Sequence, residues 1–474
     1  MRVYHTSMSQ HMNITTVNPA TGERISQYPL MGSAEVRGQA EAAAVAFHSW
    51  KRTSISERAG SIARLAAVLR AHMEDDAALI TMEMGKPVTE ARAEIEKCAW
   101  LCEYIAETGP TALEPVTVAT DGSESGYASE PLGVILAIMP WNYPYWQAFR
   151  AVVPALMAGN TVVLKHAWNV TGCAHRIVER CQEAFDGNSL VMLAVAENAI
   201  IHGLIRDPAV AAVTLTGSTA SGQAVAAVAG SEIKKCVLEL GGSDAFVVLE
   251  DADVQSAAAT AVRARFQNCG QSCIAAKRFV IHEAVYDEFL DVFTAGTQDL
   301  VVGDPCEERT QLGPLVSTEA RARIEDQVAR SLRMGAKAHL AGDRREIGCF
   351  LTPTILVACT QTMPVWEEEV FGPVAPVICV GSDKEALSHA NHPIKAARIR
   401  EVAAKDNVDL SRSSAYSDGV SDIPMLEAVG HPVCINPDRP LRAIARQRHW
   451  QIVKCDPPAR PITKRLPLRL ITES

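Results

Sequence analysis

The chain contains a cysteine, a glutamate and an asparagine whose surroundings suit acyl-transfer chemistry. Cys273 ends the string GQSC and is either an exposed nucleophile or a buried free thiol. Glu239 lies in the string LELGG and is either a general base at a strand end or a solvent-facing residue before a turn. Asn142 lies between two prolines in the string PWNYP, and an amide held in such a rigid loop can stabilise an oxyanion.

Other strings could bind a nucleotide. Gly217 and Gly222 bound a G-x-x-x-x-G turn that runs into a predicted helix. The free N–H groups at the start of that helix favour a pyrophosphate, although such a turn can also be purely structural. Lys165, in the string VLKHA, ends a predicted strand, and Glu369 stands two residues before Phe371 in the string EEEVFGP. Taken singly, each of these strings could be dismissed, and only the turn at Gly217 points to a phosphate by its own chemistry.

The hydrophobic pattern predicts the elements that position these residues. Ala-rich segments 35–48 and 55–83 have apolar residues at helical spacing. A turn at Asp121-Gly122 predicts a hairpin over residues 116–128. Three short apolar runs are typical of buried parallel strands, namely Gly133–Met139, Thr161–Leu164 and Ala211–Thr216. With helices between them, they favour a doubly wound α/β sheet, in which ligands bind at the carboxyl ends of the strands.

Composition and charge narrow the class of protein. The 474 residues carry 45 Lys and Arg against 55 Asp and Glu, a net charge of −10, so we expect no nucleic-acid partner. No apolar run is long enough for a membrane span, and the first residues contain no secretory signal. Thirteen cysteines without zinc spacing indicate reduced thiols and no metal site. We therefore expect a cytoplasmic protein that does not contact membranes.

In this order and spacing, the strings resemble the aldehyde dehydrogenase superfamily over roughly residues 16–391. The wording KHA, TGSTASG, LELGGSDAFVVLEDAD and GQSC is most similar to its bacterial NADP-dependent succinate-semialdehyde dehydrogenase branch. The resemblance implies an α/β fold with a Rossmann-like cofactor domain at 14–112 and 131–241. It also implies an oligomerisation hairpin at 113–130 and an α/β catalytic domain at 242–391.

The resemblance also implies a role for each site residue. Cys273 matches the thiol that attacks the aldehyde, Glu239 the base that activates water, and Asn142 the side-chain donor of the oxyanion hole. The implied reaction oxidises a small-molecule aldehyde to its acid through a thiohemiacetal and a thioester. The positions that match cofactor-binding residues are Trp141, Asn142, Lys165, His166, Ala167, Trp168, Gly217, Ser218, Leu240, Glu369 and Phe371.

Two positions bear on specificity. NAD-preferring relatives often have a glutamate three residues after the lysine, where this chain has Trp168, so we predict NADP as cofactor, with NAD possible. Arg150 matches an arginine that pairs with a distal substrate carboxylate, which favours succinate semialdehyde as substrate. Arg150 could also be a solvated helix residue. Arg263 and Arg265 admit the same substrate-binding interpretation.

Past Asn391 the resemblance ends. Residues 392–474 carry 14 basic and 9 acidic residues, whereas the preceding part is strongly acidic, so the charge changes sign. This segment resembles the C-terminal part of a haloacid-dehalogenase-type phosphatase, with Lys395 matching a phosphate ligand and Asp418 and Asp422 matching Mg²⁺ carboxylates. The aspartate nucleophile loop of such phosphatases is missing from the sequence.

We therefore interpret residues 392–474 as a fused fragment with an irregular tail, and the catalytic domain as C-terminally truncated. Two functional hypotheses stay open: an active dehydrogenase, and a catalytically impaired fusion or remnant of one. The family forms homo-oligomers, and whether this chain does so depends on what replaces the segments that complete the intersubunit sheet.

Overall fold

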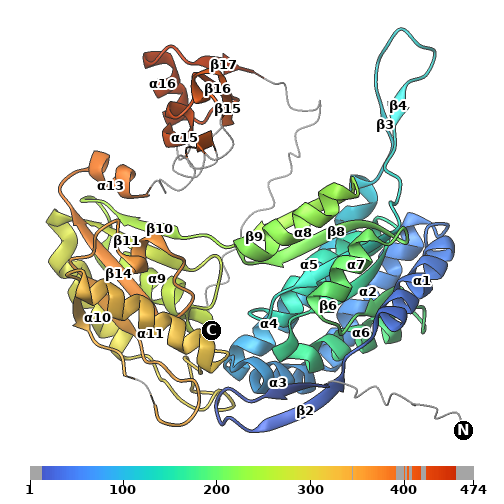
Figure 1. The fold of residues 1–474 in the computed structure, drawn as a ribbon, viewed down its shortest axis with the longest axis horizontal. Helices are drawn as coiled ribbons and strands as arrows, with labels where there is room; N and C mark the ends of the chain where they lie inside the picture. The colour runs from blue at the N-terminus through green and yellow to red at the C-terminus, as the bar shows by residue number, and fades with distance from the viewer. Residues whose placement is uncertain are drawn as a thin grey trace, which may run out of the picture. The chain divides into compact units, whose positions relative to one another are not determined.

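The computed structural model describes residues 13–343, 345–390, 400, 403–404, 408–417 and 423–454. The contacts divide the chain into two compact units, Met1–Val380 and Gly381–Ser474 (Figure 1). The first unit contains every candidate site residue, so most of the description concerns it. The predicted change of character near Asn391 falls within the second unit.

The first unit contains a five-stranded parallel sheet with the order β7-β6-β5-β8-β9. Its strands are β5 (Val134–Met139), β6 (Thr161–His166), β7 (Val191–Leu193), β8 (Val210–Gly217) and β9 (Lys235–Leu240). The helices that connect or flank them are α5 (Pro144–Met157), α6 (Thr171–Ala184), α7 (Asn198–Arg206) and α8 (Thr219–Ser231). The three strands predicted from apolar runs are confirmed as β5, β6 and β8, and the sheet is doubly wound as predicted.

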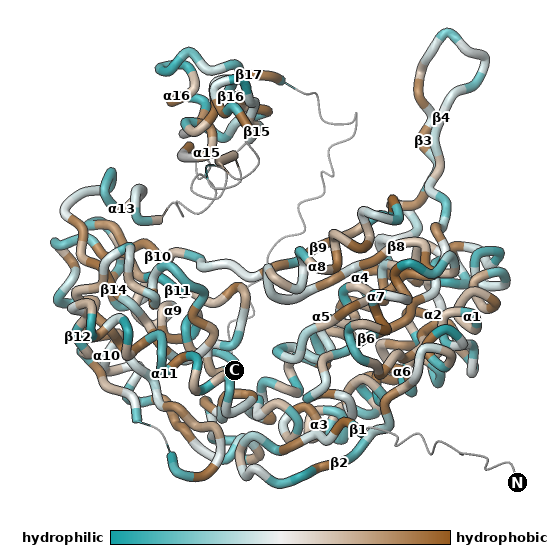
Figure 2. Tube along the Cα trace, in the orientation of Figure 1, coloured by the Kyte–Doolittle hydropathy of each residue, from teal (hydrophilic) through white to brown (hydrophobic). Residues whose placement is uncertain are grey.

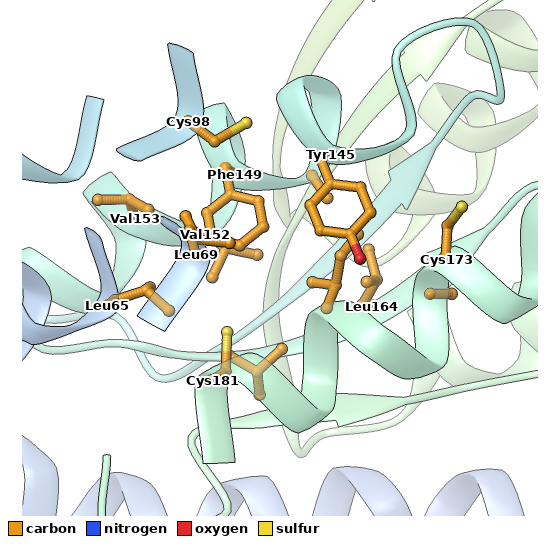
Figure 3. Close-up of a cluster of buried hydrophobic side chains, with 14 of the residues drawn as sticks. Leu65, Leu69, Cys98, Tyr145, Phe149, Val152, Val153, Leu164, Cys173 and Cys181 are labelled. Carbon is orange, nitrogen blue, oxygen red and sulfur yellow. The ribbon is translucent and has the colours of Figure 1, made fainter. Parts of the chain in front are cut away.

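The helical layer beside this sheet holds a large apolar core. Its helices are α1 (Ser33–Trp50), α2 (Ile55–Ala71), α3 (Met73–Met84) and α4 (Val88–Ala112). Figure 3 shows Leu65 and Leu69 of α2, Phe149 of α5, Leu164 of β6 and Cys181 of α6 gathered in this core, and each is at most 1% exposed. Packing of this kind makes the sheet edge a rigid platform for the loops that follow each strand.

The single helix predicted over residues 55–83 is wrong in one respect, because it is broken at His72. This residue leaves helical geometry with φ −111° and ψ 16°, and its Nε2 lies 3.0 Å from Glu183 Oε2 on α6. Three acidic residues follow in the first turn of α3, where the helix dipole favours them. The backbone at His72 and the acidic first turn after it therefore mark the start of a second helix, although the hydrophobic spacing continues across the break.

A second sheet in the same unit carries the order β10-β11-β14-β13-β12. Its strands are β10 (Asp244–Val248), β11 (Ala276–His282), β12 (Lys337–Leu340), β13 (Thr354–Val357) and β14 (Val374–Val380), and only the β12–β13 pairing is antiparallel. Helices α9 (Val254–Phe266) and α10 (Tyr286–Gln298) contact its strands, and α11 (Thr318–Arg333) contacts the short α12 (Pro364–Glu367). A separate antiparallel pair joins β1 (Asn13–Val17) and β2 (Arg24–Pro29).

The predicted hairpin is confirmed. Strands β3 (Val116–Thr117) and β4 (Gly126–Tyr127) pair antiparallel, with Val116 opposite Tyr127. The hairpin projects from the helices of the first unit in Figure 1, and its tip is hydrophilic in Figure 2. All four strand residues are exposed, so within the described chain the hairpin packs on nothing that buries it.

The second unit contains three parallel strands in the order β15-β16-β17, namely β15 (Ser414–Ser417), β16 (His431–Ile435) and β17 (Gln451–Val453). Helices α15 (Ile423–Glu427) and α16 (Arg439–Gln447) connect them, and α13 (Asp383–Ala390) precedes them. A small core is formed by Ala415, Leu426, Cys434, Leu441 and Ala445. Lys395, Asp418 and Asp422, which the phosphatase resemblance singles out, lie outside the described residues.

Candidate active site

The register of the first sheet brings four sequence motifs to one edge. Glu239 and Leu240, the last residues of β9, pair with Thr216 and Gly217 at the end of β8. The loop that contains Asn142 leaves the end of β5, next to the end of β6. Since all these strands run parallel, their carboxyl ends meet where an open α/β sheet binds ligands.

A cavity of about 230 Å³ lies at this edge and contains most of the predicted site. It draws residues from both sheets, because Cys273 precedes β11 and Glu369 precedes β14. The predicted residues that line it are Trp141, Asn142, Gly217, Ser218, Glu239, Leu240, Cys273, Glu369 and Phe371. Pro140 of the string PWNYP also lines it, and the remaining lining residues, which sequence reasoning missed as site residues, are Gln147, Thr216, Gly241 and Arg323.

The loop before Cys273 has an unusual backbone. Asn268, Cys269 and Gly270 follow one another with φ of 52°, 54° and 72°, in the left-handed region that residues with side chains rarely adopt. A Cβ on Gly270 would lie 2.4 Å from the main-chain oxygen of Gly372, so only glycine fits there. This turn directs the chain into the cavity three residues before the thiol.

Arg265 holds this turn from α9. Its side chain is fully buried and donates hydrogen bonds to the carbonyl oxygens of Gly270 at 2.9 Å, Gly372 at 2.7 Å and Ala276 at 2.8 Å. Burial lowers the pKa of Arg265 to about 10. The substrate-binding interpretation of Arg265 is therefore wrong: its guanidinium is committed to backbone acceptors. Arg263 is exposed and bonds to Thr260.

The two cysteines of the loop differ in their surroundings. Cys269 is 1% exposed, and burial raises the pKa of its thiol to about 12, so it remains protonated near neutral pH. Cys273 is half-buried and lines the cavity. Geometry therefore favours Cys273 as the nucleophile, the same residue that the sequence motif indicates.

Asn142 connects the two loops of the site. Its side-chain Nδ2 donates to the backbone carbonyl oxygen of Gln271 at 3.1 Å, and its backbone carbonyl oxygen accepts from Asn268 Nδ2 at 2.7 Å. A primary amide carries two N–H donors, and the bond to Gln271 uses one of them. Asn142 is thus fixed beside the nucleophile loop, as an oxyanion donor requires.

Two glutamates one turn apart on α4 accept hydrogen bonds from backbone N–H groups next to Asn142 and in the loop before Cys273. Glu94 accepts hydrogen bonds from the backbone N–H groups of Tyr145 at 2.8 Å and Trp146 at 2.9 Å, at the start of α5, and forms a buried ion pair with Lys86. Glu90 accepts from the backbone N–H of Asn268 at 2.9 Å. Burial raises the pKa of Glu90 to about 7, and Lys86 opposes the shift. Nothing in the spacing of these glutamates distinguishes them from a solvated helix face.

The candidate base and the candidate substrate residue form an ion pair. Arg150 Nη2, on α5, lies 3.1 Å from Glu239 Oε1 on β9, and both side chains are partly exposed. Arg150 itself does not line the cavity, but its side chain reaches a residue that does. A guanidinium in this place could instead pair with a carboxylate that enters the cavity.

The phosphate turn is a capped helix N-terminus. Ser218 is the N-cap of α8, and its Oγ accepts from the backbone N–H of Ser221 at 3.2 Å. A Cβ on Gly222 would lie 2.6 Å from Leu240 Cδ2, so glycine permits the close contact between α8 and β9. The remaining N–H groups of the first turn and the helix dipole suit a pyrophosphate.

Lys165 and His166 end β6, Ala167 and Trp168 follow it, and all four lie outside the lining of the cavity. Burial lowers the pKa of Lys165. His166 is buried: its Nε2 lies 2.9 Å from the carbonyl oxygen of Pro144, and its Nδ1 accepts from the backbone N–H of Ala167. Burial lowers the pKa of His166 to about 4, so the ring is neutral and supports the Asn142 loop. Trp168 is 43% exposed.

Glu369 and Phe371 line the cavity from the segment that precedes β14. The ring of Phe371 meets Trp141 edge to face, with ring centroids 5.6 Å apart. Glu369 Oε1 lies 3.3 Å from Lys277 Nζ, and a Cβ on Gly241 would lie 2.1 Å from Glu369 Oε2. Gly241 thus provides space for a carboxylate that could accept ribose hydroxyls.

The described part of the chain shows neither a metal-binding cluster nor a membrane-spanning helix. No cluster of three or more His, Cys, Asp or Glu side chains is arranged to hold a metal ion within it. None of its helices is both long and apolar enough to cross a membrane.

Comparison with known proteins identifies close relatives. The aldehyde dehydrogenase family matches residues 5–397. The chain is 42% identical over 377 residues to the NAD(P)+-dependent succinate semialdehyde dehydrogenase Sad of Escherichia coli, covering 79% of this chain and 82% of that protein. It is 44% identical over 385 residues to the NADP+-dependent succinate-semialdehyde dehydrogenase of Mycobacterium leprae, covering 80% and 84%.

Solved structures agree in fold. The crystal structure of succinic semialdehyde dehydrogenase from Streptococcus pyogenes in complex with NADP+ matches with a TM-score of 0.78 and 30% identity, over 93% of this chain and 90% of that chain. The lactaldehyde dehydrogenase of Escherichia coli also matches with a TM-score of 0.78, at 32% identity, over 81% of each chain. The structural match to the former thus extends over a larger share of this chain than the sequence matches do.

Proposed function

Because the chain belongs to the aldehyde dehydrogenase family and has its α/β fold, we propose that it oxidises succinate semialdehyde to the acid with NADP. The observation that carries the proposal is the cavity of about 230 Å³ that Cys273, Glu239 and Asn142 share with the residues of the cofactor side. A thiol, a carboxylate and an amide at one cavity are what nucleophilic oxidation of an aldehyde requires.

Each residue has a task in this reaction. The Cys273 thiolate attacks the aldehyde carbon and forms a thiohemiacetal, whose oxyanion accepts a hydrogen bond from Asn142. The nicotinamide cofactor, when bound, supplies the hydride acceptor that turns this adduct into a thioester. Glu239 then removes a proton from water, which attacks the thioester carbon and expels the Cys273 thiolate with the acid as product.

The protein groups present fit a dinucleotide phosphate. The N-terminus of α8 with Ser218 suits the pyrophosphate, and the Glu369 carboxylate suits the nicotinamide ribose. Lys165 can attract the 2′-phosphate of the adenosine ribose, and Trp168 stands where a repelling carboxylate would favour NAD instead. We therefore infer a preference for NADP.

Trp168→Glu is expected to shift this preference toward NAD. A carboxylate there can accept bonds from the ribose hydroxyls and repels the 2′-phosphate, so the NADP-to-NAD ratio of kcat/KM should fall by about tenfold or more. Trp168→Gln, which is as long but neutral, is the control and should change the ratio less. A wild-type enzyme with a strong preference for NAD would contradict this account of the pocket.

Arg150 is proposed to bind the distal carboxylate of the substrate. Its guanidinium already pairs with a carboxylate, Glu239, at 3.1 Å, and a bidentate arginine suits the planar group of succinate semialdehyde. The carboxylate that Arg150 pairs with lines the same cavity as the Cys273 thiol, so the guanidinium is within reach of that cavity's edge.

Arg150→Met is expected to raise KM for succinate semialdehyde by about tenfold or more, since the substrate carboxylate loses its cation. Butanal, which has the same carbon chain without the carboxylate, should be oxidised with little change in KM. Arg150→Lys keeps the charge and should raise KM for succinate semialdehyde by less than Arg150→Met does. Equal losses with both aldehydes would show that Arg150 acts through Glu239 alone.

The decisive experiment follows the absorbance of reduced cofactor. Purified full-length chain, checked for folding by size-exclusion chromatography, is mixed with succinate semialdehyde and NADP, then NAD. Steady cofactor reduction supports an active enzyme. A folded protein that reduces neither cofactor with succinate semialdehyde or with neutral aldehydes would favour the alternative, an impaired fusion or remnant.

The remaining assignments are also inferences. We place the cofactor domain at 14–112 and 131–241, an oligomerisation hairpin at 113–130 and an incomplete catalytic domain at 242–391. Homo-oligomers would cover the exposed hairpin residues Val116 and Tyr127.

The free cysteines of the described chain fit the reducing cytoplasm. Three parallel strands with helices between them are consistent with a haloacid-dehalogenase-like fragment at 392–474, which lacks the aspartate nucleophile.

A further inference from the structure

Lys277, a residue that no motif singles out, lies between the two halves of the site. It is the second residue of β11, and its side chain is 0% exposed. A buried lysine is rare, and it requires partners that compensate the lost hydration of its ammonium group. Lys277 has two such partners, and both belong to the proposed active site.

One partner is the nucleophile's own backbone. Lys277 Nζ donates a hydrogen bond to the carbonyl oxygen of Cys273 at 2.6 Å. The other partner is Glu369, whose Oε1 lies 3.3 Å away. A single ammonium group therefore joins the residue that attacks the aldehyde to the carboxylate proposed to hold the nicotinamide ribose.

The local backbone is shaped for this contact. In the pairing of β10 with β11, Asp244 is opposite Ala276 and Ala245 is opposite Arg278, so the register skips Lys277. A bulge of this kind turns a side chain away from the regular alternation of the strand. Arg278 then resumes the ladder and donates from Nε to the carbonyl oxygen of Ser243 at 2.9 Å.

Opposing influences act on the charge of Lys277. Burial is the largest of them and lowers the pKa of Lys277, Arg265 on α9 acts in the same direction, and Glu369 and Asp244 oppose the shift. Glu369 is confined in turn, because its Oε2 lies against Gly241. A hydrogen bond from a ligand to Glu369 would change how far its carboxylate offsets the Lys277 charge at the nucleophile loop.

We propose that Lys277 is a positioning residue that couples cofactor binding to the nucleophile, through its ion pair with Glu369 and its hydrogen bond to the Cys273 carbonyl oxygen. The proposal rests on the proposed function of Glu369. When ribose hydroxyls engage Glu369, the Lys277 charge is less compensated, and a cation near a thiol favours the reactive thiolate. Bound NADP therefore makes Cys273 more reactive, and the effect requires Lys277.

Alkylation of Cys273 tests the coupling without turnover. Iodoacetamide is added to the full-length chain with and without saturating NADP, and mass spectrometry quantifies the modified Cys273 peptide, which separates it from the exposed Cys306 and Cys379. In the wild type, NADP should speed alkylation by about threefold or more. In Lys277→Met, which keeps length but removes the charge, the ratio should fall to about one.

Two further variants secure the result. Lys337→Met removes an exposed lysine from the same sheet and should keep the wild-type ratio. Glu369→Gln breaks the link from its other end and should also bring the ratio to about one at saturating NADP. This variant decides the matter if Lys277→Met does not fold.

Two results would overturn the coupling: a wild-type ratio of one or less, or a wild-type ratio in a folded Lys277→Met protein. Steady NADP reduction by the same wild-type preparation is measured in parallel. If it persists while the alkylation ratio is one, the coupling fails and the proposed function stands. If NADP neither binds nor is reduced, the proposed function fails as well.

Discussion

Cys273→Ala is expected to lower aldehyde oxidation by about a thousandfold or more, because without the thiol neither the thiohemiacetal nor the thioester can form. The measurement is the steady-state rate of NADP reduction with succinate semialdehyde. The loss should appear in kcat, while NADP still binds, because Cys273 contributes no proposed cofactor contact.

Cys269→Ala is the matched control, since it removes a thiol from the same loop. Cys269 is buried and its raised pKa keeps it protonated, so its replacement should leave most of the activity. Equal losses in the two variants would contradict the assignment of Cys273, and would point to the left-handed turn as the common cause.

Glu239→Gln is expected to separate the two halves of the reaction. Hydride transfer does not need the base, so one equivalent of reduced cofactor should form rapidly. Thioester hydrolysis then becomes the slow step, and kcat should fall by about a hundredfold or more. Rapid mixing with absorbance detection shows the burst, and mass spectrometry of the quenched protein shows the acyl group on Cys273.

Glutamine also loses the ion pair with Arg150, so the aldehyde matters in this experiment. With butanal, which has no carboxylate, the burst should resemble that with succinate semialdehyde once both are saturating. Steady turnover at the wild-type rate in Glu239→Gln would remove Glu239 from the mechanism.

The sequence predicts the strands and the reacting residues of the site better than the residues that hold its loops in place. Strands β5, β6 and β8 are recognisable because each is a short apolar run, and parallel strands place the following loops at one edge. Cys273 and Glu239 lie in separate strings, yet the structure places both at one cavity. The order of the motifs was sufficient to place these two residues together, because short loops follow the strands of a well-packed sheet.

The supporting residues could not be predicted because their roles depend on distant partners. Arg265 looks like a possible substrate residue until its hydrogen bonds to backbone carbonyl groups are seen. Lys277 depends on a register shift between β10 and β11, and no sequence pattern reveals such a shift. Hydrophobic spacing likewise misses the break at His72, because the spacing continues across it.

The carboxyl group of Glu90, which accepts the backbone N–H of Asn268, has a consequence for the heat of unfolding. Its pKa is about 7 in the folded chain, above the ordinary value of 4.5. Between these two pH values the folded protein holds a proton that the unfolded chain releases, so the free energy of unfolding falls as pH rises through this window. Calorimetry near pH 6 should therefore show an unfolding enthalpy that depends on the ionisation heat of the buffer. Glu90→Gln, which carries no titrating proton, should reduce that dependence.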